Sequence, residues 1–125
     1  MTKDELRIAV AEARGWERKK LSERDTGGAI HRYYAWVRVD NNGDEEERLR
    51  LPDYPNSMDA CMPLIEEMRW DKDALGNLYE RQITIEYHHK WVMYLYAHGE
   101  YTCHAMGDTL PEAICEVYLE WKGEQ

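Results

Sequence analysis

Apolar positions at helical spacing predict a helix at the start of the chain. Beginning at Leu6, they recur at i, i+3, i+4 and i+7 and so share one face of a helix. Thr2, with Glu5 three residues later, forms a capping box, and Gly15 stands where a left-handed C-cap ends such a helix. We therefore predict a helix over residues 2–15.

The same periodicity predicts helices in the middle and at the end of the chain. Ser57 has the place of an N-cap before a helix that begins at Met58. Thr109 and Glu112 form a second capping box before the C-terminal helix. The stretch 72–79 is predicted to form a further short helix. The apolar faces predicted for the middle and C-terminal helices are Met58, Cys61, Met62, Ile65 and Met68, and Leu110, Ala113, Ile114, Val117, Tyr118 and Trp121.

Alternating apolar and polar residues predict strands between the helices. The stretch IHRYYAWVRV is rich in aromatic and β-branched residues, and Asp40-Asn41-Asn42-Gly43-Asp44 after it is a turn signal. Alternation after this turn predicts a return strand, and the C-terminal third contains three more alternating stretches. The strands predicted in this way are 30–39, 48–51, 83–88, 91–96 and 101–105.

Strands and helices in separate runs predict an α+β fold. We expect a compact single-domain α/β sandwich, residues 1–125, in which the N-terminal, middle and C-terminal helices pack on a small antiparallel sheet. A chain of 125 residues with 43% hydrophobic residues has room for one core. Residues 17–28 combine mixed charges with Asp25-Thr26-Gly27-Gly28 and are interpreted as a flexible joint behind the first helix.

Hydropathy favours a cytoplasmic protein. The mean hydropathy is -0.81, and no apolar run approaches the roughly 20 residues of a membrane span. The opening residues MTKDELRIAV include acids and lack the apolar stretch of a secretory signal. We therefore expect no membrane association and a location in a cytoplasm.

Charge limits the class of partner. The chain has 16 basic and 25 acidic residues, a net charge of -9, yet residues 1–24 hold seven basic and five acidic side chains. The acidic remainder disfavours direct nucleic-acid binding, which depends on Lys and Arg at phosphates, and favours a partner protein with a basic groove. A solvated, merely solubilising surface remains the alternative. The acidic candidates for partner binding gather at one turn: Asp40, Asp44, Glu45, Glu46 and Glu47.

Aromatic composition indicates a second candidate surface. The chain has five Trp and nine Tyr but no Phe, a bias toward rings with a polar edge that is typical of interfaces. The strand residues that could form an aromatic platform on one sheet face are Tyr34, Trp36, Tyr94 and Tyr96. Two alternatives stay open: a half-buried floor beneath the helices, and a pocket that stacks a nucleotide base.

Motifs of metal, phosphate and nucleophilic chemistry are missing from the sequence. The five histidines and three cysteines show no CxxC, HxxxH or HExxH spacing, so we predict no metal and no cofactor. The odd number of cysteines argues against disulfides, and we interpret them as buried thiols. An enzyme is not predicted; the one enzymatic hypothesis is a small hydrolase that uses His98, Cys103 and His104.

Three segments of the sequence resemble a known family. They are MTKDELRIAVAEARGW, LPDYPNSMDACMPLIEEM and TLPEAICEVYLEWKG, which in order and spacing are similar to the phage ABA sandwich domain proteins. The resemblance implies a compact α/β sandwich, a phage or prophage origin and action in the host bacterial cytoplasm. It carries over no catalytic residue. The chain departs from the family pattern at Pro63 and in the acidic hairpin 40–47.

The resemblance and the charge together lead to one functional hypothesis. We expect a non-enzymatic phage accessory protein that binds and inhibits a host defence factor, such as a CRISPR effector, through its acidic surface. The alternatives are a sponge for a nucleotide signal that uses the Tyr/Trp face, and a structural or regulatory phage protein. The sequence leaves the oligomeric state open.

Overall fold

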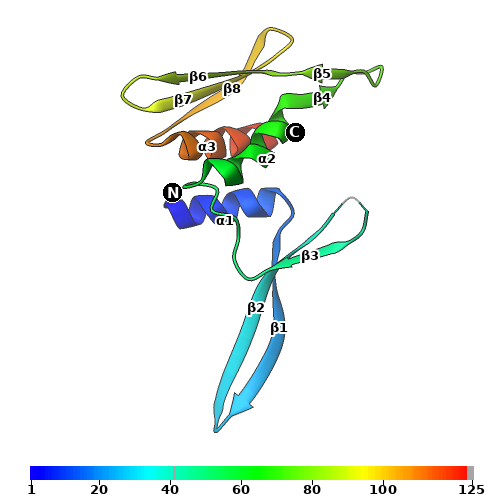
Figure 1. Ribbon diagram of the computed structural model, residues 1–125, viewed down its shortest axis with the longest axis vertical. Coiled ribbons are helices and arrows are strands. Elements are labelled where there is room, and N and C mark those ends of the chain that lie inside the picture. The colour runs from blue at the N-terminus through cyan, green and yellow to red at the C-terminus, as the bar shows by residue number, and fades with distance from the viewer. Residues whose placement is uncertain (41, 124–125) are drawn as a thin grey trace. The chain divides into compact units, whose positions relative to one another are not determined.

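The computed structural model describes residues 1–40 and 42–123, and for residues 21–26 and 31–33 it describes the backbone alone. These residues form three helices and three antiparallel sheets, which confirms the predicted α+β class (Figure 1). No helix among them combines the length and the apolar character that crossing a membrane requires. The elements are α1 (Lys3–Ala13), β1 (Glu17–Thr26), β2 (Ala29–Val39), β3 (Glu45–Arg48), α2 (Met58–Arg69), β4 (Trp70–Lys72), β5 (Leu78–Glu80), β6 (Gln82–Tyr87), β7 (Trp91–Ala97), β8 (Glu100–Gly107) and α3 (Leu110–Gly123).

The chain divides into two compact units. The first unit comprises Met1–Val10 and Asp53–Gln125, and the second comprises Ala11–Pro52. The first therefore contains most of α1 together with α2, α3 and β4 to β8. The second contains the last turn of α1 and the sheet of β1, β2 and β3.

Both predicted ends of the first helix are confirmed. The backbone N–H of Glu5 donates to Thr2 Oγ1 at 3.1 Å, as a capping box requires. At the other end, Trp16 N donates to Ala11 O at 3.0 Å and Gly15 N donates to the carbonyl of Glu12 at 3.0 Å. Gly15 has a φ of 90°, so these two bonds form a Schellman motif that ends the helix.

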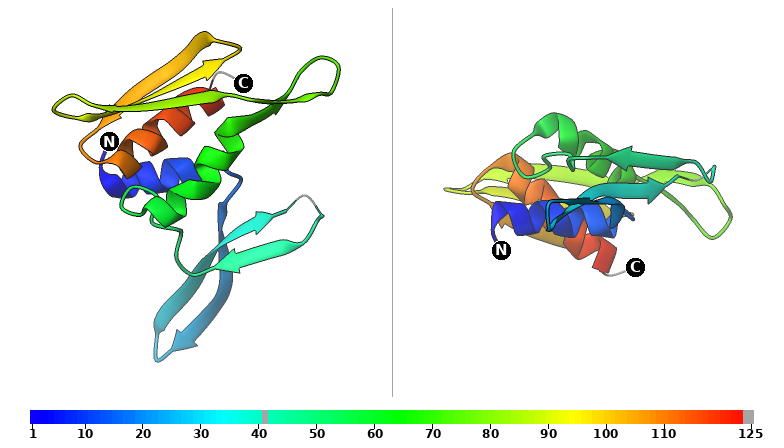
Figure 2. Two further views of the ribbon diagram at one scale, coloured as in Figure 1. Left: turned by 45° about the horizontal axis from the view of Figure 1, so that its top comes forward. Right: turned by 90° about the horizontal axis from the view of Figure 1, so that it is seen from below.

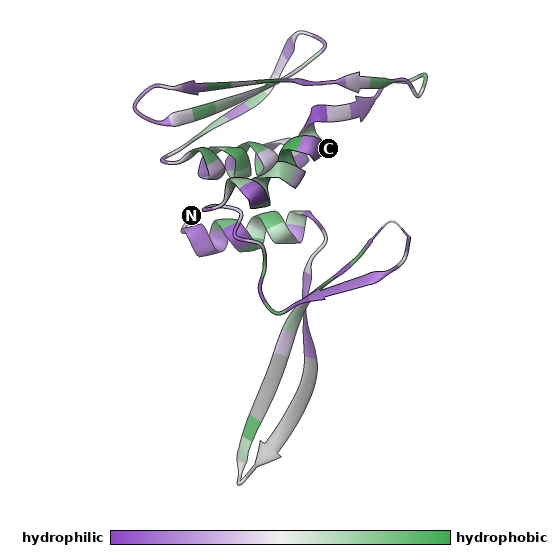
Figure 3. Cartoon of the chain, in the orientation of Figure 1, coloured by the Kyte–Doolittle hydropathy of each residue, from purple (hydrophilic) through white to green (hydrophobic). Residues whose placement is uncertain are grey.

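The core of the first unit lies between α3 and the sheet of β6, β7 and β8. Helix α3 contacts β7 and β8, and α2 contacts α3, as two views of the ribbon show (Figure 2). Thr109 Oγ1 accepts the backbone N–H of Glu112 at 3.3 Å, so the predicted C-terminal helix and its cap are confirmed. Hydrophobic residues, coloured green in Figure 3, lie along α2 and α3. The fully buried side chains of this core include Leu64, Met68, Met93, Leu95, Ile114, Val117 and Tyr118.

The middle helix begins where the sequence predicts, but its buried face is rotated. Ser57 Oγ accepts the backbone N–H of Ala60 at 3.2 Å and caps a helix that starts at Met58. The residues of α2 that are buried are Cys61, Leu64 and Met68. The predicted inclusion of Met58 and Met62 is wrong, since they are 38% and 46% exposed. Met62 lies about 100° around the helix from Cys61, away from the buried stripe.

The short helix predicted over residues 72–79 is wrong, because this stretch forms the hairpin of β4 and β5. Lys72 pairs with Leu78, and the turn between them depends on one carboxylate. Asp73 Oδ1 accepts the backbone N–H groups of Leu75 and Asn77, each at 2.9 Å. Gly76 closes the turn with a φ of 82°, a conformation that a helix does not contain.

In the second unit, a strand occupies most of the predicted flexible joint 17–28, so that prediction is wrong. Residues 17–26 form β1, which pairs antiparallel with β2 until Thr26 lies opposite Ala29. Gly27 and Gly28 have φ angles of 63° and 90°, which suit a two-residue type I′ turn. Because β1 is polar at both alternating positions, no apolar periodicity marks it as a strand.

The predicted strand 30–39 is confirmed as β2, and a hairpin follows it. Asp40 Oδ1 accepts the backbone N–H groups of Asn42 and Asp44, each at 2.9 Å, while Asn41 lies outside the described residues. The return strand is not 48–51 but β3, so the acidic run itself pairs with β2. Because the turn is tight, β3 begins pairing with β2 directly after it, with Glu45 opposite Val39, and not at residue 48.

The three predicted strands of the C-terminal third are confirmed. They form one sheet in the order β6-β7-β8, and both pairings are antiparallel. This sheet has one face against α3, and its opposite face points away from that helix.

Candidate functional site

The predicted aromatic platform is divided between two sheets. Tyr34 and Trp36 lie on β2 in the second unit, whereas Tyr94 and Tyr96 lie on β7 in the first unit. The prediction that all four residues share one sheet face is therefore wrong. Each sheet has its own aromatic face.

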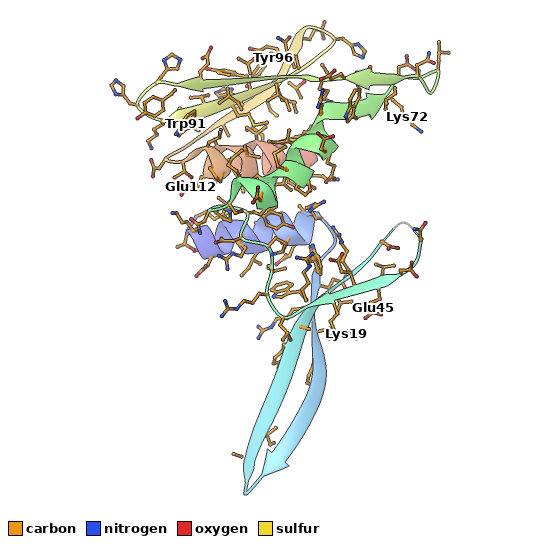
Figure 4. All side chains as sticks on the ribbon, in the orientation of Figure 1. Lys19, Glu45, Lys72, Trp91, Tyr96 and Glu112 are labelled. Atoms are coloured by element: carbon orange, nitrogen blue, oxygen red, sulfur yellow. The ribbon has the colours of Figure 1, made fainter. Side chains whose placement is uncertain are left out.

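Tyrosines gather on the face of the β6-β7-β8 sheet that points away from α3. Met93 and Leu95, which alternate with Tyr94 and Tyr96 along β7, are fully buried on the side of α3. Tyr94 and Tyr96 consequently project to the other side, and Figure 4 labels Tyr96 on this strand. The half-buried floor beneath the helices, one of the sequence-based alternatives, does not apply to these two residues.

Strand β8 adds two more rings to this face. Tyr94 lies opposite His104 with 5.4 Å between ring centroids, and Tyr96 lies opposite Tyr101 with 6.3 Å between them. Tyr94 and Tyr96 stack on each other at 6.4 Å. The Tyr101 hydroxyl is hydrogen-bonded to His104 Nδ1. We call Tyr94, Tyr96, Tyr101 and His104 the tyrosine cluster.

A β-bulge makes the cluster possible. The register between β7 and β8 shifts between Leu95 and Tyr96, which leaves Thr102 as an extra residue on β8. Residues three apart on a regular strand point to opposite faces, yet the extra residue turns Tyr101 and His104 to the same face. Sequence reasoning missed His104 as the partner of Tyr94 and Tyr101 as the partner of Tyr96, because nothing in the pattern of β8 indicates a bulge.

The cluster is open to solvent and lies next to polar residues. Tyr101 is 55% exposed, and Tyr94 and Tyr96 are half-buried. On β6, the neighbouring pairs are Gln82 with Tyr96 and Thr84 with Tyr94. The result is a flat face of rings with hydroxyl and amide groups beside them, a composition that suits contact with a protein surface.

All of the net charge belongs to the unit that contains the tyrosine cluster. The first unit has seven basic and sixteen acidic residues, whereas the second has nine of each. The negative field of this protein therefore comes from the first unit. The acidic turn, which sequence reasoning singled out, lies in the unit without net charge.

Ion pairs and hydrogen bonds already occupy most carboxylates of the acidic turn. The Asp40 side chain caps the turn, and Glu45 lies 3.9 Å from Lys19, beside it in Figure 4. Glu46 accepts from Arg48 at 3.0 Å and from Arg38 at 2.9 Å. Hydrogen bonds from these arginines, Arg48 first, hold the pKa of Glu46 below its ordinary value. Within the described residues, Asp44 and Glu47 have no ion-pair partner and remain available.

The residues of the hydrolase hypothesis do not converge. Cys103 is buried on the α3 side of β8, and His104 next to it belongs to the opposite, exposed face. His98 lies in the turn before β8 with a φ of 54°, and its ring packs on Tyr79 with 4.1 Å between centroids. Across residues 1–40 and 42–123, no group of three His, Cys, Asp or Glu side chains could hold a metal ion.

The cysteines lie in the core, as the sequence predicts. Cys61, Cys103 and Cys115 are all buried and free of disulfides. Cys61 Sγ donates to the carbonyl of Tyr54 at 3.0 Å. A hydrogen bond with Cys61 and burial raise the pKa of the Cys115 thiol, so Cys115 is not prepared for nucleophilic chemistry.

A groove of about 520 Å³ lies between α2 and β6, but its charged groups are engaged within the protein. Arg69 Nε donates to Glu80 at 2.7 Å, and Arg81 donates to the carbonyl of Met68 at 2.9 Å and also pairs with Asp71. The backbone N–H of Lys72 and the hydroxyl of Tyr79 lower the pKa of Asp71 and keep it ionised beside Arg81. These contacts explain how an arginine is buried here without indicating a catalytic role.

Comparisons with protein-family models, curated proteins and solved structures found no match to this chain.

Proposed function

We propose that this protein is a non-enzymatic binding protein whose tyrosine cluster contacts an arginine- and lysine-rich surface of a partner protein. One observation carries the proposal: an uncovered face of three tyrosines and a histidine lies in the unit that holds the whole net negative charge.

Tyrosine rings suit this role physically. Each ring offers apolar area at a small cost in side-chain entropy, and its hydroxyl keeps a hydrogen bond with water or the partner. An arginine or lysine placed over a tyrosine ring is attracted by the negative ring face. The cluster packs its rings against one another, which keeps Tyr94, Tyr96 and Tyr101 in place before any partner arrives.

The charge of the first unit supports the choice of a basic partner. A negative field increases the rate of encounter with a positive surface and discriminates against acidic ones. The acidic turn contributes less to this proposal than the sequence suggested, because Asp40, Glu45 and Glu46 have partners within the protein.

The resemblance to phage ABA sandwich proteins supports a more specific form of the proposal. In this form the partner is a host defence factor of the bacterial cytoplasm, such as a CRISPR effector, which is inhibited when its basic groove is covered. Occlusion of a groove requires no reaction at the binding face.

The test is capture of partners from bacterial lysate by purified variants. Replacing Tyr96 and Tyr101 by Ala removes the centre of the cluster and is expected to weaken capture of the specific partner about 30-fold, the effect of losing an interface hot spot. The matched control is Tyr87→Ala, since Tyr87 is a 62% exposed tyrosine of the same sheet that contacts Trp91 outside the cluster.

A third variant separates the two candidate surfaces. Changing Asp44 and Glu47 to Ala removes the carboxylates of the acidic turn that have no ion-pair partner among the described residues. Loss of capture in this variant, with full capture by the tyrosine variant, would transfer the binding role to the turn and reject the cluster. Equal loss in the Tyr87→Ala control would also reject the cluster.

A further inference from the structure

A second aromatic face, this one basic, lies on the sheet of β1, β2 and β3. Alternating positions bring Tyr34, Trp36 and Arg38 of β2 to the same side as Arg18 of β1 and Arg48 of β3. We call these five residues the arginine–tryptophan face. All of them belong to the second unit.

The strand register gives this face a regular pattern. Trp36 is the direct neighbour of Arg18 on one side and of Arg48 on the other, so a tryptophan stands between two arginines across three strands. Directly opposite residues in antiparallel strands have Cβ atoms roughly 5 Å apart. The guanidinium of Arg18 lies 4.3 Å from the ring centroid of Tyr34, diagonally across the same two strands.

The face is partly exposed and retains positive charge. Arg18 is exposed, Tyr34 is 40% exposed and Trp36 is half-buried. Arg38 and Arg48 share the single carboxylate of Glu46, so this group keeps one excess positive charge. No ion pair of Arg18 occurs within the described residues, where it contacts the ring of Tyr34.

The other side of the same sheet differs in character. Ala35 and Val37 project there and are buried, and Lys19 projects there beside Glu45. The sheet is thus amphipathic, and the three arginines of the face lie on the same side as its exposed rings. Charge complementarity therefore indicates an anionic ligand for the arginine–tryptophan face.

We infer that the arginine–tryptophan face binds single-stranded nucleic acid. Arginines neutralise backbone phosphates, while the faces of Trp36 and Tyr34 stack on unpaired bases, which is how sequence-tolerant single-strand sites are built. An acidic peptide would use the arginines but has no bases for the rings. A duplex offers phosphates but keeps its bases stacked inside.

A nucleic-acid site on this face differs from the expectation, based on the net charge of the whole sequence, that direct nucleic-acid binding is disfavoured. The net charge of -9 belongs entirely to the first unit, and the second unit is neutral with a locally basic face. Local charge at the contact surface decides phosphate binding. The inference concerns another surface than the tyrosine cluster and does not depend on the proposed function.

The experiment measures fluorescence anisotropy of a labelled 15-nucleotide deoxythymidine strand against the full-length protein over a series of salt concentrations. The matched pair of variants is Arg18→Ala and Lys19→Ala, which remove one positive charge from adjacent residues on opposite sides of β1. Arg18→Ala is expected to weaken binding about fivefold or more and to reduce the salt slope by about 0.7. Lys19→Ala is expected to change affinity less than about twofold.

Variants of the rings test stacking. Trp36→Ala is expected to weaken binding by about fivefold or more, and Trp36→Phe is expected to restore most of it, because a phenyl ring still stacks. If circular dichroism shows that Trp36→Ala is unfolded, Tyr34→Ala takes its place, since this ring lies at the surface.

Three outcomes would overturn the inference. Equal effects of Arg18→Ala and Lys19→Ala would show unspecific attraction to the sheet as a whole. Competition by polyglutamate as strong as by unlabelled deoxythymidine strand would show an acidic-peptide site. Equal affinity for a duplex of the same length would show that unpaired bases are not recognised.

Discussion

Single carboxylates and hydroxyls determine where elements of this protein begin and turn. Asp40 and Asp73 each accept two backbone N–H groups of the following residues. Ser57 does the same for one N–H at the start of α2. Such side chains replace the backbone partners that a turn or a helix end lacks, so each stabilises the element that it caps.

Loss of the cap at Ser57 is expected to lower the stability of the protein measurably. Ser57→Ala is expected to lower the free energy of unfolding by about 1 kcal/mol, since the N–H of Ala60 loses its acceptor. Urea denaturation followed by circular dichroism measures the change. The control is Met62→Ala on the exposed side of α2, which should change stability by less than about 0.5 kcal/mol. Equal losses in both variants would contradict the capping role.

The shared carboxylate of Glu46 makes stability depend on pH. Its pKa is lowered from the ordinary 4.5 by hydrogen bonds from Arg48 and Arg38, so ionised Glu46 favours the folded state. This contribution is fully present above pH 4.5 and is lost as the pH falls through the lower pKa of the folded protein. Glu46→Gln is therefore expected to be less stable than the wild type at pH 7, and the difference is expected to shrink as the pH falls below 4.5.

Thermal unfolding at pH 7, 5 and 3 measures the effect of Glu46. The neighbour Glu47 provides the control, because it has no ion-pair partner among the described residues and projects to the other side of β3. Glu47→Gln should follow the wild type at all three values. A constant difference between wild type and Glu46→Gln from pH 7 to pH 3 would contradict the argument.

At the scale of elements, one five-residue turn is used twice. In both copies an aspartate begins the turn, a glycine with positive φ stands three residues later, and the first and fifth residues are hydrogen-bonded. The spacing is visible in the sequence as Asp40 with Gly43 and as Asp73 with Gly76. Comparison of the two stretches would have predicted the β4–β5 hairpin in place of a helix.

The junction of β8 with α3 requires a glycine, because the two elements approach each other closely at Gly107. A Cβ atom on Gly107 would lie 2.5 Å from the backbone nitrogen of Ala113, so neither the strand end nor the helix start can yield easily. Gly107→Ala is expected to destabilise the protein by about 1–3 kcal/mol in urea denaturation. Gly123→Ala is the control, because a Cβ there meets nothing within 4 Å and Ala favours a helix. Similar stability of the two variants would refute the close contact.

At the scale of the whole molecule, the distribution of charge matters more than its total. Only the first unit carries net negative charge, and the second displays a basic aromatic face. One acidic protein can therefore present surfaces suited to partners of opposite sign. The net charge of -9 alone does not show this difference between the two units.

Two charge reversals that raise the net charge equally test this view. Glu86→Lys changes the β6 residue two positions from Thr84 on the side of the tyrosine cluster, whereas Asp44→Lys changes the turn of the second unit. Glu86→Lys is expected to slow association with the captured basic partner about fivefold or more at low salt, measured by surface plasmon resonance. Asp44→Lys is expected to have a clearly smaller effect. Equal slowing would mean that total charge governs the encounter.

The sequence by itself determined the local structure wherever a short-range signal exists. Caps at Thr2, Ser57 and Thr109, the C-cap at Gly15 and the alternation of β7 all depend on residues a few positions apart. Backbone hydrogen bonding and side-chain periodicity are physical constraints at that range, so their patterns are legible in one chain. The α+β class followed from the same signals.

Only the tertiary structure decided which residues share a surface. Strand β1 has no apolar alternation and is a strand because β2 pairs with it. The tyrosine cluster required a bulge at Thr102, and Tyr34 proved to belong to another sheet than Tyr94. Partner choice between strands and shifts in register depend on contacts between distant segments, and such contacts leave no fixed spacing in the sequence.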